Sequence, residues 1–203
     1  MQDLRFRLKG FTVNADYMPK NESFCNLPVV AWEKLEERFP PGETLLLGPI
    51  SYRSNNRFRR DRYLEGKARG YDFATWVHPS AQVEGASIGE NSVIFDGCTV
   101  QPFAKIGTSS ILWSKVHIGH HSAVGDNCFM ASFCGIAGNS RVGDCTFFGG
   151  HTGLVDNCSI GSNCIVTAGA IVTQAVPDGS IVIGSKARIL HNAADRFGRR
   201  ILG

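Results

Sequence analysis

The stretch 111-ILWSKVHIGHHSAVGDNC-128 holds the pattern that decides the fold of this chain, together with half of its six histidines. A large apolar residue returns every six positions within it, at Leu112, Ile118 and Val124. The same step continues outward in both directions without a slip and places large apolar residues at fifteen successive positions between 88 and 172. A period of six fits neither an α-helix nor an alternating strand, so it indicates a repeat architecture.

Two further regularities set the size and shape of the repeat. The residue two places before each apolar one is Ala, Ser, Cys or Thr in fourteen of the fifteen cases, and Val116 is the exception. Glycine follows every third apolar residue, at positions 89, 107, 125, 143 and 161, so the full period is 18 residues in three sides. The large residue of each side points inward and the small residue fits into the corner. The pattern predicts a triangular parallel β-helix whose coils stack about 4.8 Å apart.

The overall composition is that of an ordinary globular protein. The chain has 203 residues, of which 43% are hydrophobic and 19% charged. No stretch approaches the roughly 18 uninterrupted apolar residues that a transmembrane helix requires. The net charge of +3 is too small to indicate nucleic-acid binding. We therefore expect neither a membrane span nor a nucleic-acid partner.

The seven cysteines are explained mainly by the repeat. Their number is odd, they form no CxxC pair, and no apolar core follows the basic N-terminus as it would in a secretory signal. These features predict a reducing, cytoplasmic location. Five of the cysteines occupy the small inward position and are interpreted as buried hydrophobic residues: Cys98, Cys128, Cys134, Cys158 and Cys164.

The chain divides into three parts. Residues 77–184 carry the β-helix pattern, residues 1–76 lack it, and residues 185–203 form a basic tail. The first part alternates strand and helix signals, which favours a small α/β unit with a parallel sheet. Its predicted elements are a strand at 10–14, a strand leading into a short helix at 27–39, a buried strand at 44–48 and a helix at 55–71.

The predicted helix at 55–71 is unusually rich in arginine, with Arg57, Arg59, Arg60, Arg62 and Arg69. A solvated helix face explains these residues, and attraction of a phosphate or nucleotide is the alternative. The basic tail after residue 184 has the same two interpretations, a solvated surface or contact with the phosphates of a bound cofactor.

The histidines of the opening stretch fall on the outside of the predicted coil. His117 points outward from its side, and His120 and His121 lie at the approach to a corner. Residues 18 positions further on stack directly above, so Gly135 lies above His117 and Gly138 above His120. The surface over the histidines is therefore nearly bare of side chains, and a groove is expected along the stack.

A histidine on such a wall is suited to general base catalysis, because its unperturbed pKa is about 6.5. It can take a proton from a hydroxyl or amine that attacks a thioester, while the N–H group of Gly138 steadies the developing oxyanion. Zinc binding by the three histidines is the alternative. Adjacent His120 and His121 diverge in an extended chain, however, and no further histidine lies one or two coils away. We expect no metal.

The string WSKVHIGHHSAVGD, within a hexapeptide repeat, resembles the sugar O- and N-acyltransferases of the sialic acid O-acetyltransferase (NeuD-like) type. Similar stretches are GFTVNADY, LPVVAWEKLE, KARGYDFATWVHPSA and TAGAIVTQAVPDGSIVIGSKAR, so the resemblance covers nearly the whole chain. It implies a left-handed parallel β-helix with an N-terminal, apparently incomplete Rossmann-like domain. The implied activity is acetyl transfer from acetyl-CoA to a hydroxyl or amine of a sugar or nucleotide-sugar.

The resemblance also assigns roles to single residues. His120 matches the general base, His121 stands where relatives often have an acidic residue that orients this base, and Gly138 matches the backbone donor that faces the thioester. His117 is placed in support of the pair. The positions that match the coenzyme A groove and the closing motif are Gly150, Ala168 and Lys186. Relatives are homotrimers with active sites between subunits, which is the assembly expected here.

Three departures from the family pattern accompany these matches. The family opens with a strand and a glycine-rich turn that holds phosphates. MQDLRFRLKGFTV lacks this turn, which fits either a shortened start or a different way of holding the acceptor. His121 cannot supply the negative charge of an acidic orienter, and Lys186 replaces the proline of the closing motif. The alternatives to an acyltransferase are a non-catalytic β-helix scaffold or regulatory subunit and, with poorer ligand spacing, a γ-class carbonic anhydrase-like metalloenzyme.

Overall fold

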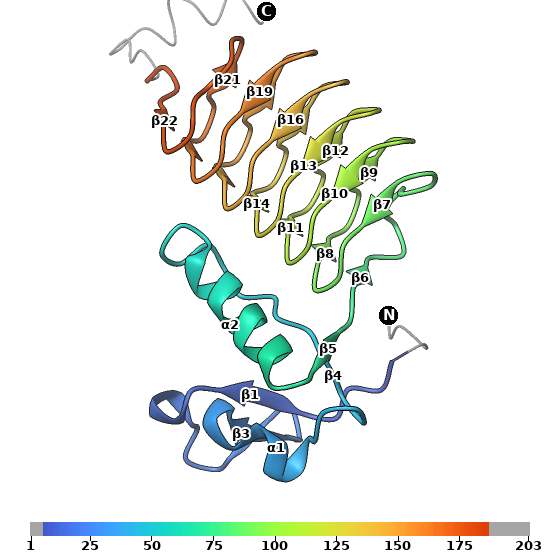
Figure 1. Ribbon diagram of the computed structural model, residues 1–203, viewed down its shortest axis with the longest axis vertical. Helices are drawn as coiled ribbons and strands as arrows, with labels where there is room; N and C mark the ends of the chain where they lie inside the picture. Colours follow the sequence, from blue (N-terminus) through green and yellow to red (C-terminus); the bar gives the residue numbers. More distant parts are fainter. Residues whose placement is uncertain (1–5, 187–203) are drawn as a thin grey trace, which may run out of the picture.

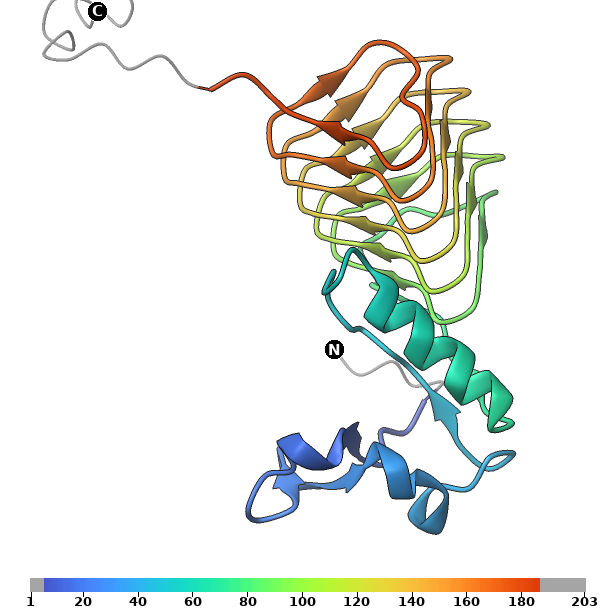
Figure 2. The ribbon, with the colours of Figure 1, turned by 60° about the vertical axis from the view of Figure 1, so that its left-hand side comes forward.

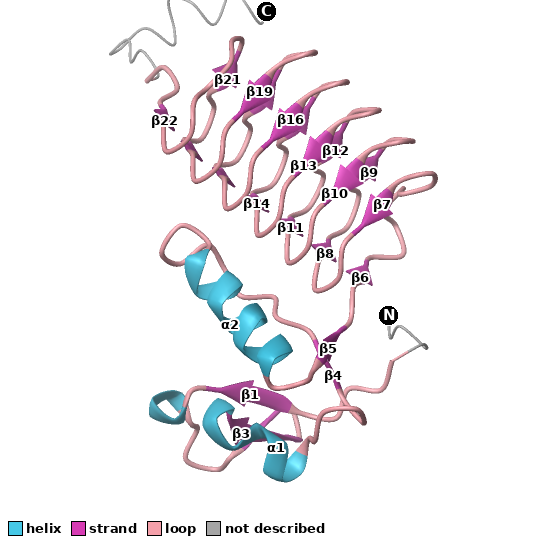
Figure 3. Cartoon of the chain, in the orientation of Figure 1, coloured by secondary structure: helices cyan, strands magenta, loops and turns pink. Residues whose placement is uncertain are grey.

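A computed structural model describes residues 6–186 of the chain. The coils stack into a three-sided column, and the N-terminal elements lie at the end where the column begins (Figure 1). Figure 2 shows the triangular outline of the coils. Helices occur before residue 69, and the remainder of the described chain consists of short strands and turns (Figure 3).

Three parallel sheets form the sides of the column. The first sheet contains β7 (Ser87–Ile88), β10 (Lys105–Ile106), β13 (Ala123–Val124), β16 (Arg141–Val142) and β19 (Ser159–Ile160). The second contains β6 (Trp76–Val77), β8 (Val93–Ile94), β11 (Ile111–Leu112), β14 (Phe129–Met130), β17 (Phe147–Phe148), β20 (Ile165–Val166) and β22 (Ile181–Val182). The third contains β9 (Thr99–Val100), β12 (His117–Ile118), β15 (Gly135–Ile136), β18 (Gly153–Leu154) and β21 (Ile171–Val172).

The register between strands is the predicted 18 residues, as in the pairing of Ile118 with Ile136. Both of these side chains are fully buried in the central core, because the second residue of each strand points inward. The five cysteines at the small inward position are buried as predicted, and all seven cysteines are free thiols. Each corner turns tightly, which places a residue such as His121 or Asn139 in the left-handed region with φ between 50° and 60°.

The N-terminal part contains two small sheets. Its strands are β1 (Phe11–Val13), β2 (Ser23–Phe24), β3 (Leu27–Ala31), β4 (Leu45–Leu46) and β5 (Asp72–Phe73), and its helices are η1 (Ala15–Tyr17), η2 (Trp32–Lys34), α1 (Leu35–Arg38) and α2 (Arg57–Ala68). β1 pairs with β3 and β4 with β5 in parallel, but β2 joins β3 antiparallel. The predicted burial of the strand at 44–48 is wrong. Leu45 is 51% exposed, because β4 has β5 as its single neighbour.

The prediction of a solvated arginine face on α2 is also wrong for Arg59, which is fully buried against the β-helix. Its guanidinium donates hydrogen bonds to the backbone carbonyls of Ser109 (2.8 Å), Asn127 (2.8 Å) and Cys128 (3.0 Å). These carbonyls lie in the corner between the first and second sheets. Arg59 therefore binds the β-helix itself, and neither solvent nor phosphate.

The other arginines of this segment, apart from exposed Arg57, pair with carboxylates: Arg60 with Asp61, Arg62 with Glu65, and Arg69 with Glu36 and Glu65. The predicted basic tail lies outside the described residues, except for exposed Ser185 and Lys186.

Candidate active site

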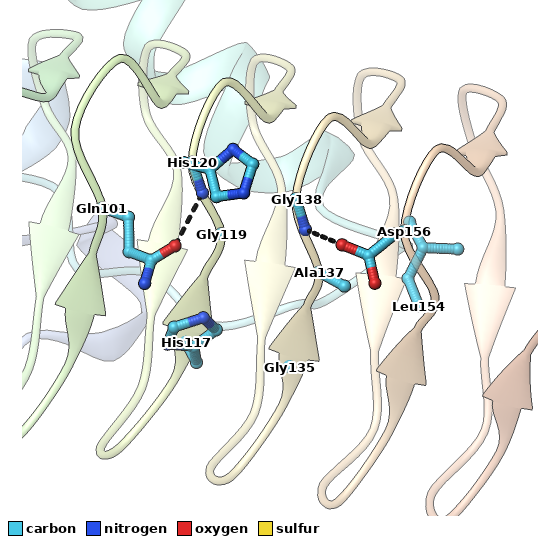
Figure 4. A pocket seen from close by; sticks show the side chains of 9 residues that line it. All are labelled: Gln101, His117, Gly119, His120, Gly135, Ala137, Gly138, Leu154 and Asp156. Carbon is cyan, nitrogen blue, oxygen red and sulfur yellow. Dashed lines mark hydrogen bonds between the residues drawn. The ribbon is translucent and has the colours of Figure 1, made fainter.

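A cavity of about 360 Å³ opens over the outer face of the third sheet and the corner that follows it. Four successive coils line it, and the polar side chains come from three of them (Figure 4). They are Gln101, His117, His120 and Asp156, and the glycines Gly135 and Gly138 form part of its floor.

The strand β12 places His117 on the outer face because its neighbour Ile118 points into the core. Gly135 of β15 pairs with His117, and a Cβ built on Gly135 would meet no atom within 4 Å. The predicted bare surface over His117 is therefore present, and it leaves room for a ligand along the third sheet.

The imidazole of His120 is oriented by its neighbour. The Nδ1 atoms of His120 and His121 lie 3.2 Å apart, and the His121 ring stacks on Phe103 with its centroid at 4.8 Å. Two such nitrogens share a hydrogen bond when one carries the proton. If His120 donates, its Nε2 is unprotonated and free to accept a proton, so His121 can orient the base without a negative charge. Gln101 adds a further restraint, since its Oε1 accepts the backbone N–H of His120 at 2.8 Å.

Gly138 lies one coil beyond His120. A Cβ on Gly138 would lie 2.7 Å from His120 Nε2, closer than non-bonded atoms approach, so the imidazole keeps this position only beside a glycine. The Gly138 N–H, predicted as an oxyanion donor, points to the cavity but donates to Asp156 Oδ1 at 2.9 Å. It can stabilise an oxyanion after the carboxylate has released it.

The other predicted binding residues lie apart from this cavity. Gly150 and Ala168 occupy the corner between the second and third sheets, where the Gly169 N–H donates to Gly150 O at 3.0 Å. Lys186 follows β22 and is exposed. A ligand that contacts these residues and His120 must therefore cross the outer face of the third sheet.

Gln101 and Asp156 are site residues that the sequence reasoning missed. For Asp156 a signal was available, because it stands two full coils after His120 and directly after Gly138 in the same column. Within residues 6–186 no group of three or more His, Cys, Asp or Glu is placed to hold a metal ion. None of the helices in the described residues is long and apolar enough to cross a membrane.

We expect Gly138→Ala to lower the rate of acetyl transfer by about 100-fold, because the new methyl group displaces the His120 imidazole by a fraction of an ångström or more. The φ of Gly138 is not in the left-handed region, so the backbone tolerates alanine and the melting temperature should change little. Gly135→Ala is the comparison, since its methyl enters the same cavity without a clash, and its loss should be smaller. Steady-state kinetics of both variants checks this; full activity of Gly138→Ala would contradict it.

The protein is thus a three-sided parallel β-helix that carries an oriented histidine at a corner lined by glycines. No protein-family model and no curated protein matches the sequence. Solved structures do match. The acetyltransferase domain of PglB from Neisseria gonorrhoeae FA1090 is 25% identical, with a TM-score of 0.74 over 83% of this chain and 82% of that one. The same domain is known in complex with acetyl coenzyme A.

A second match is perosamine N-acetyltransferase from Caulobacter crescentus, in a variant with one histidine replaced by asparagine, in complex with CoA and GDP-perosamine. It is 25% identical, with a TM-score of 0.75 over 89% of this chain and 84% of that one. UDP-N-acetylglucosamine O-acyltransferase from Moraxella catarrhalis RH4 supports the fold alone, at 21% identity and a TM-score of 0.50 over 65% of this chain and 59% of that one. The chain is thus a structural match to the hexapeptide-repeat sugar acetyltransferases, and the predicted left-handed β-helix is confirmed.

Proposed function

We propose that the protein transfers an acetyl group from acetyl-CoA to a hydroxyl or amine of a nucleotide-linked sugar, with His120 as general base. One observation carries the proposal. His120 lines the cavity and its Nε2 lies beside the backbone of Gly138, while its Nδ1 lies 3.2 Å from His121 Nδ1. This is the arrangement that a base needs in order to reach a proton on an incoming acceptor.

The reaction needs no enzyme nucleophile. The acceptor oxygen or nitrogen attacks the thioester carbonyl and gives its proton to His120 Nε2. The carbon–sulfur bond then breaks, and the imidazolium returns the proton to the departing thiolate. The negative charge that develops on the carbonyl oxygen can be stabilised by the Gly138 N–H once Asp156 Oδ1 has released this N–H. His117 lines the approach along the third sheet.

The matched proteins support the choice of substrates, since one binds acetyl coenzyme A and another CoA with GDP-perosamine. By analogy, the acetyl donor lies along the third sheet toward Gly150 and Ala168, and Lys186 meets the phosphates. Residues 1–76 form the acceptor side and residues 77–184 the acyltransferase domain.

We infer that three copies assemble so that a neighbouring chain closes the groove. The outer face of the third sheet is bare at Gly135. Large apolar side chains are exposed on this sheet at Ile171 (62%) and in its bordering turns at Phe103 (67%) and Phe133 (48%). Burying such residues against another copy is favourable. Sedimentation should give three times the chain mass of 22.1 kDa.

The proposed function is tested by thiol release from acetyl-CoA with a panel of free sugars, sugar nucleotides and amino-sugar nucleotides that includes GDP-perosamine. We expect release that depends on the acceptor, and calorimetric binding of coenzyme A by the protein alone. A protein that neither binds coenzyme A nor releases thiol with any acceptor would instead be a β-helix scaffold.

A further inference from the structure

The carboxylate of Asp156 and the imidazole of His120 face the same space above Gly138 from opposite sides (Figure 4). The point where a Cβ on Gly138 would lie is 2.7 Å from His120 Nε2 and 3.3 Å from Asp156 Oδ1. Because Gly138 has no side chain, nothing separates the two groups there. Both groups line the same cavity, so a ligand atom placed between them can contact both.

The negative charge of Asp156 is not neutralised by the protein. Within residues 6–186 no Lys or Arg forms an ion pair with this exposed carboxylate, and the described residues that line the cavity include no basic side chain apart from the histidines. A positive charge on a ligand is thus favoured at this position, and a neutral donor gains a weaker interaction with the carboxylate.

We propose that Asp156 determines acceptor specificity by binding the ammonium group of an amine acceptor next to His120. This inference rests on the proposed function and assigns the acceptor atom within it. An ammonium group has three N–H donors, so one can bond to the Asp156 carboxylate while another points at His120 Nε2. A hydroxyl group is uncharged and has a single donor. Because this donor must point at His120, none is left for Asp156.

The transfer step balances in protons and bonds. The bound ammonium loses one proton to solvent through the open cavity, and the resulting amine stays attached to Asp156 through an N–H. Its lone pair forms the carbon–nitrogen bond with the thioester carbonyl, and His120 takes the second proton. The carbon–sulfur bond breaks and the imidazolium protonates the thiolate. The products are the amide, free coenzyme A and one proton in solution.

A purely structural role for Asp156 has to be separated from this one. Aspartates at the corner between the first and second sheets also accept an N–H from the coil before them, as Asp126 does from Thr108 at 2.7 Å and Asp144 from Asp126 at 2.8 Å. Such bonds tie coils together. Asp156 differs because its bond lies beside the His120 imidazole, and Asp126 is therefore its matched control.

The test compares kcat/KM for GDP-perosamine and for GDP-rhamnose, which carries a hydroxyl in place of the amine, in wild type, Asp156→Asn and Asp126→Asn. Asparagine keeps the shape and still accepts the Gly138 N–H, but removes the charge. We expect Asp156→Asn to lower kcat/KM for the amine by about 10- to 100-fold, the range for a lost charge-assisted hydrogen bond, mainly through KM. The KM for acetyl-CoA and all parameters of Asp126→Asn should stay unchanged, and any activity with GDP-rhamnose should fall by less in Asp156→Asn than the activity with GDP-perosamine.

Each other outcome has a defined meaning. Equal losses with the amine and the hydroxyl acceptor, or an unchanged amine rate in Asp156→Asn, would overturn the role of Asp156. So would thiol release with hydroxyl sugars and none with any amine of the panel, and in that case the proposed acetyl transfer would survive. Absence of turnover with every acceptor would contradict both the proposed acetyl transfer and the role of Asp156.

Discussion

His120→Asn is expected to reduce acetyl transfer by about 100- to 10,000-fold, the usual contribution of a general base, while binding of coenzyme A persists. The reason is geometric. His120 Nε2 is the nitrogen that lies beside Gly138 at the wall of the cavity, and an asparagine amide cannot accept a proton there at neutral pH. The fold should be unaffected, because His120 is exposed and its backbone N–H still reaches Gln101.

The measurement combines turnover with calorimetry. Steady-state thiol release gives the catalytic loss, and titration with coenzyme A shows whether the site is intact. His78→Asn is a suitable control, since His78 bonds to Ser80 near the start of the β-helix. A loss of less than tenfold in His120→Asn, with normal behaviour of the control, would mean that another group takes the proton. In the matched Caulobacter protein a histidine-to-asparagine variant was observed with CoA and GDP-perosamine bound, so such a change is compatible with binding in that enzyme.

The β-helix was predictable from the sequence because its contacts lie at a fixed spacing along the chain. Each coil contacts the coil 18 residues away, so the partner of any residue is found by counting, as Gly135 is for His117. The same counting places Gly138 and then Asp156 beyond His120. Counting does not reveal which atom accepts the hydrogen bond of the Gly138 N–H, because this depends on the rotamer of Asp156.

The N-terminal part was less predictable because its elements meet the β-helix through side chains far apart in sequence. The exposure of Leu45 follows from an open sheet edge, and the burial of Arg59 from the position of α2 on a corner of the column. A local pattern of arginines identifies a helix face but does not say what covers it. Asn55 and Asn56 belong to the same contact, since they donate to the carbonyls of Asn163 (3.2 Å) and Cys145 (3.3 Å).

The buried Arg59 leads to the largest expected effect on stability. Burial lowers the pKa of Arg59 to about 10, so the guanidinium is still charged at neutral pH and depends on its hydrogen bonds. It donates to the corner carbonyls of the β-helix and also to Ile50 O (2.9 Å) and Ser51 O (3.2 Å). In Arg59→Ala the buried carbonyls of Ser109 and Asn127 lose the guanidinium donor, whereas Cys128 O keeps the N–H of Ile111. Each buried unsatisfied group costs about 1–3 kcal/mol. We expect the free energy of unfolding to fall by at least about 3 kcal/mol.

Urea unfolding followed by circular dichroism measures this loss, and two further variants show its origin. Arg57→Ala changes an exposed arginine two residues earlier on the same helix and should alter stability by less than about 0.5 kcal/mol. Arg59→Lys keeps a charge but offers a compact ammonium in place of the planar fork, so it should recover only part of the loss. If Arg59→Ala unfolds like wild type, then α2 is not held to the β-helix by these bonds. A loss in Arg59→Ala but not in Arg57→Ala would show that the hydrogen bonds of Arg59 help to hold α2 on the column that carries His120.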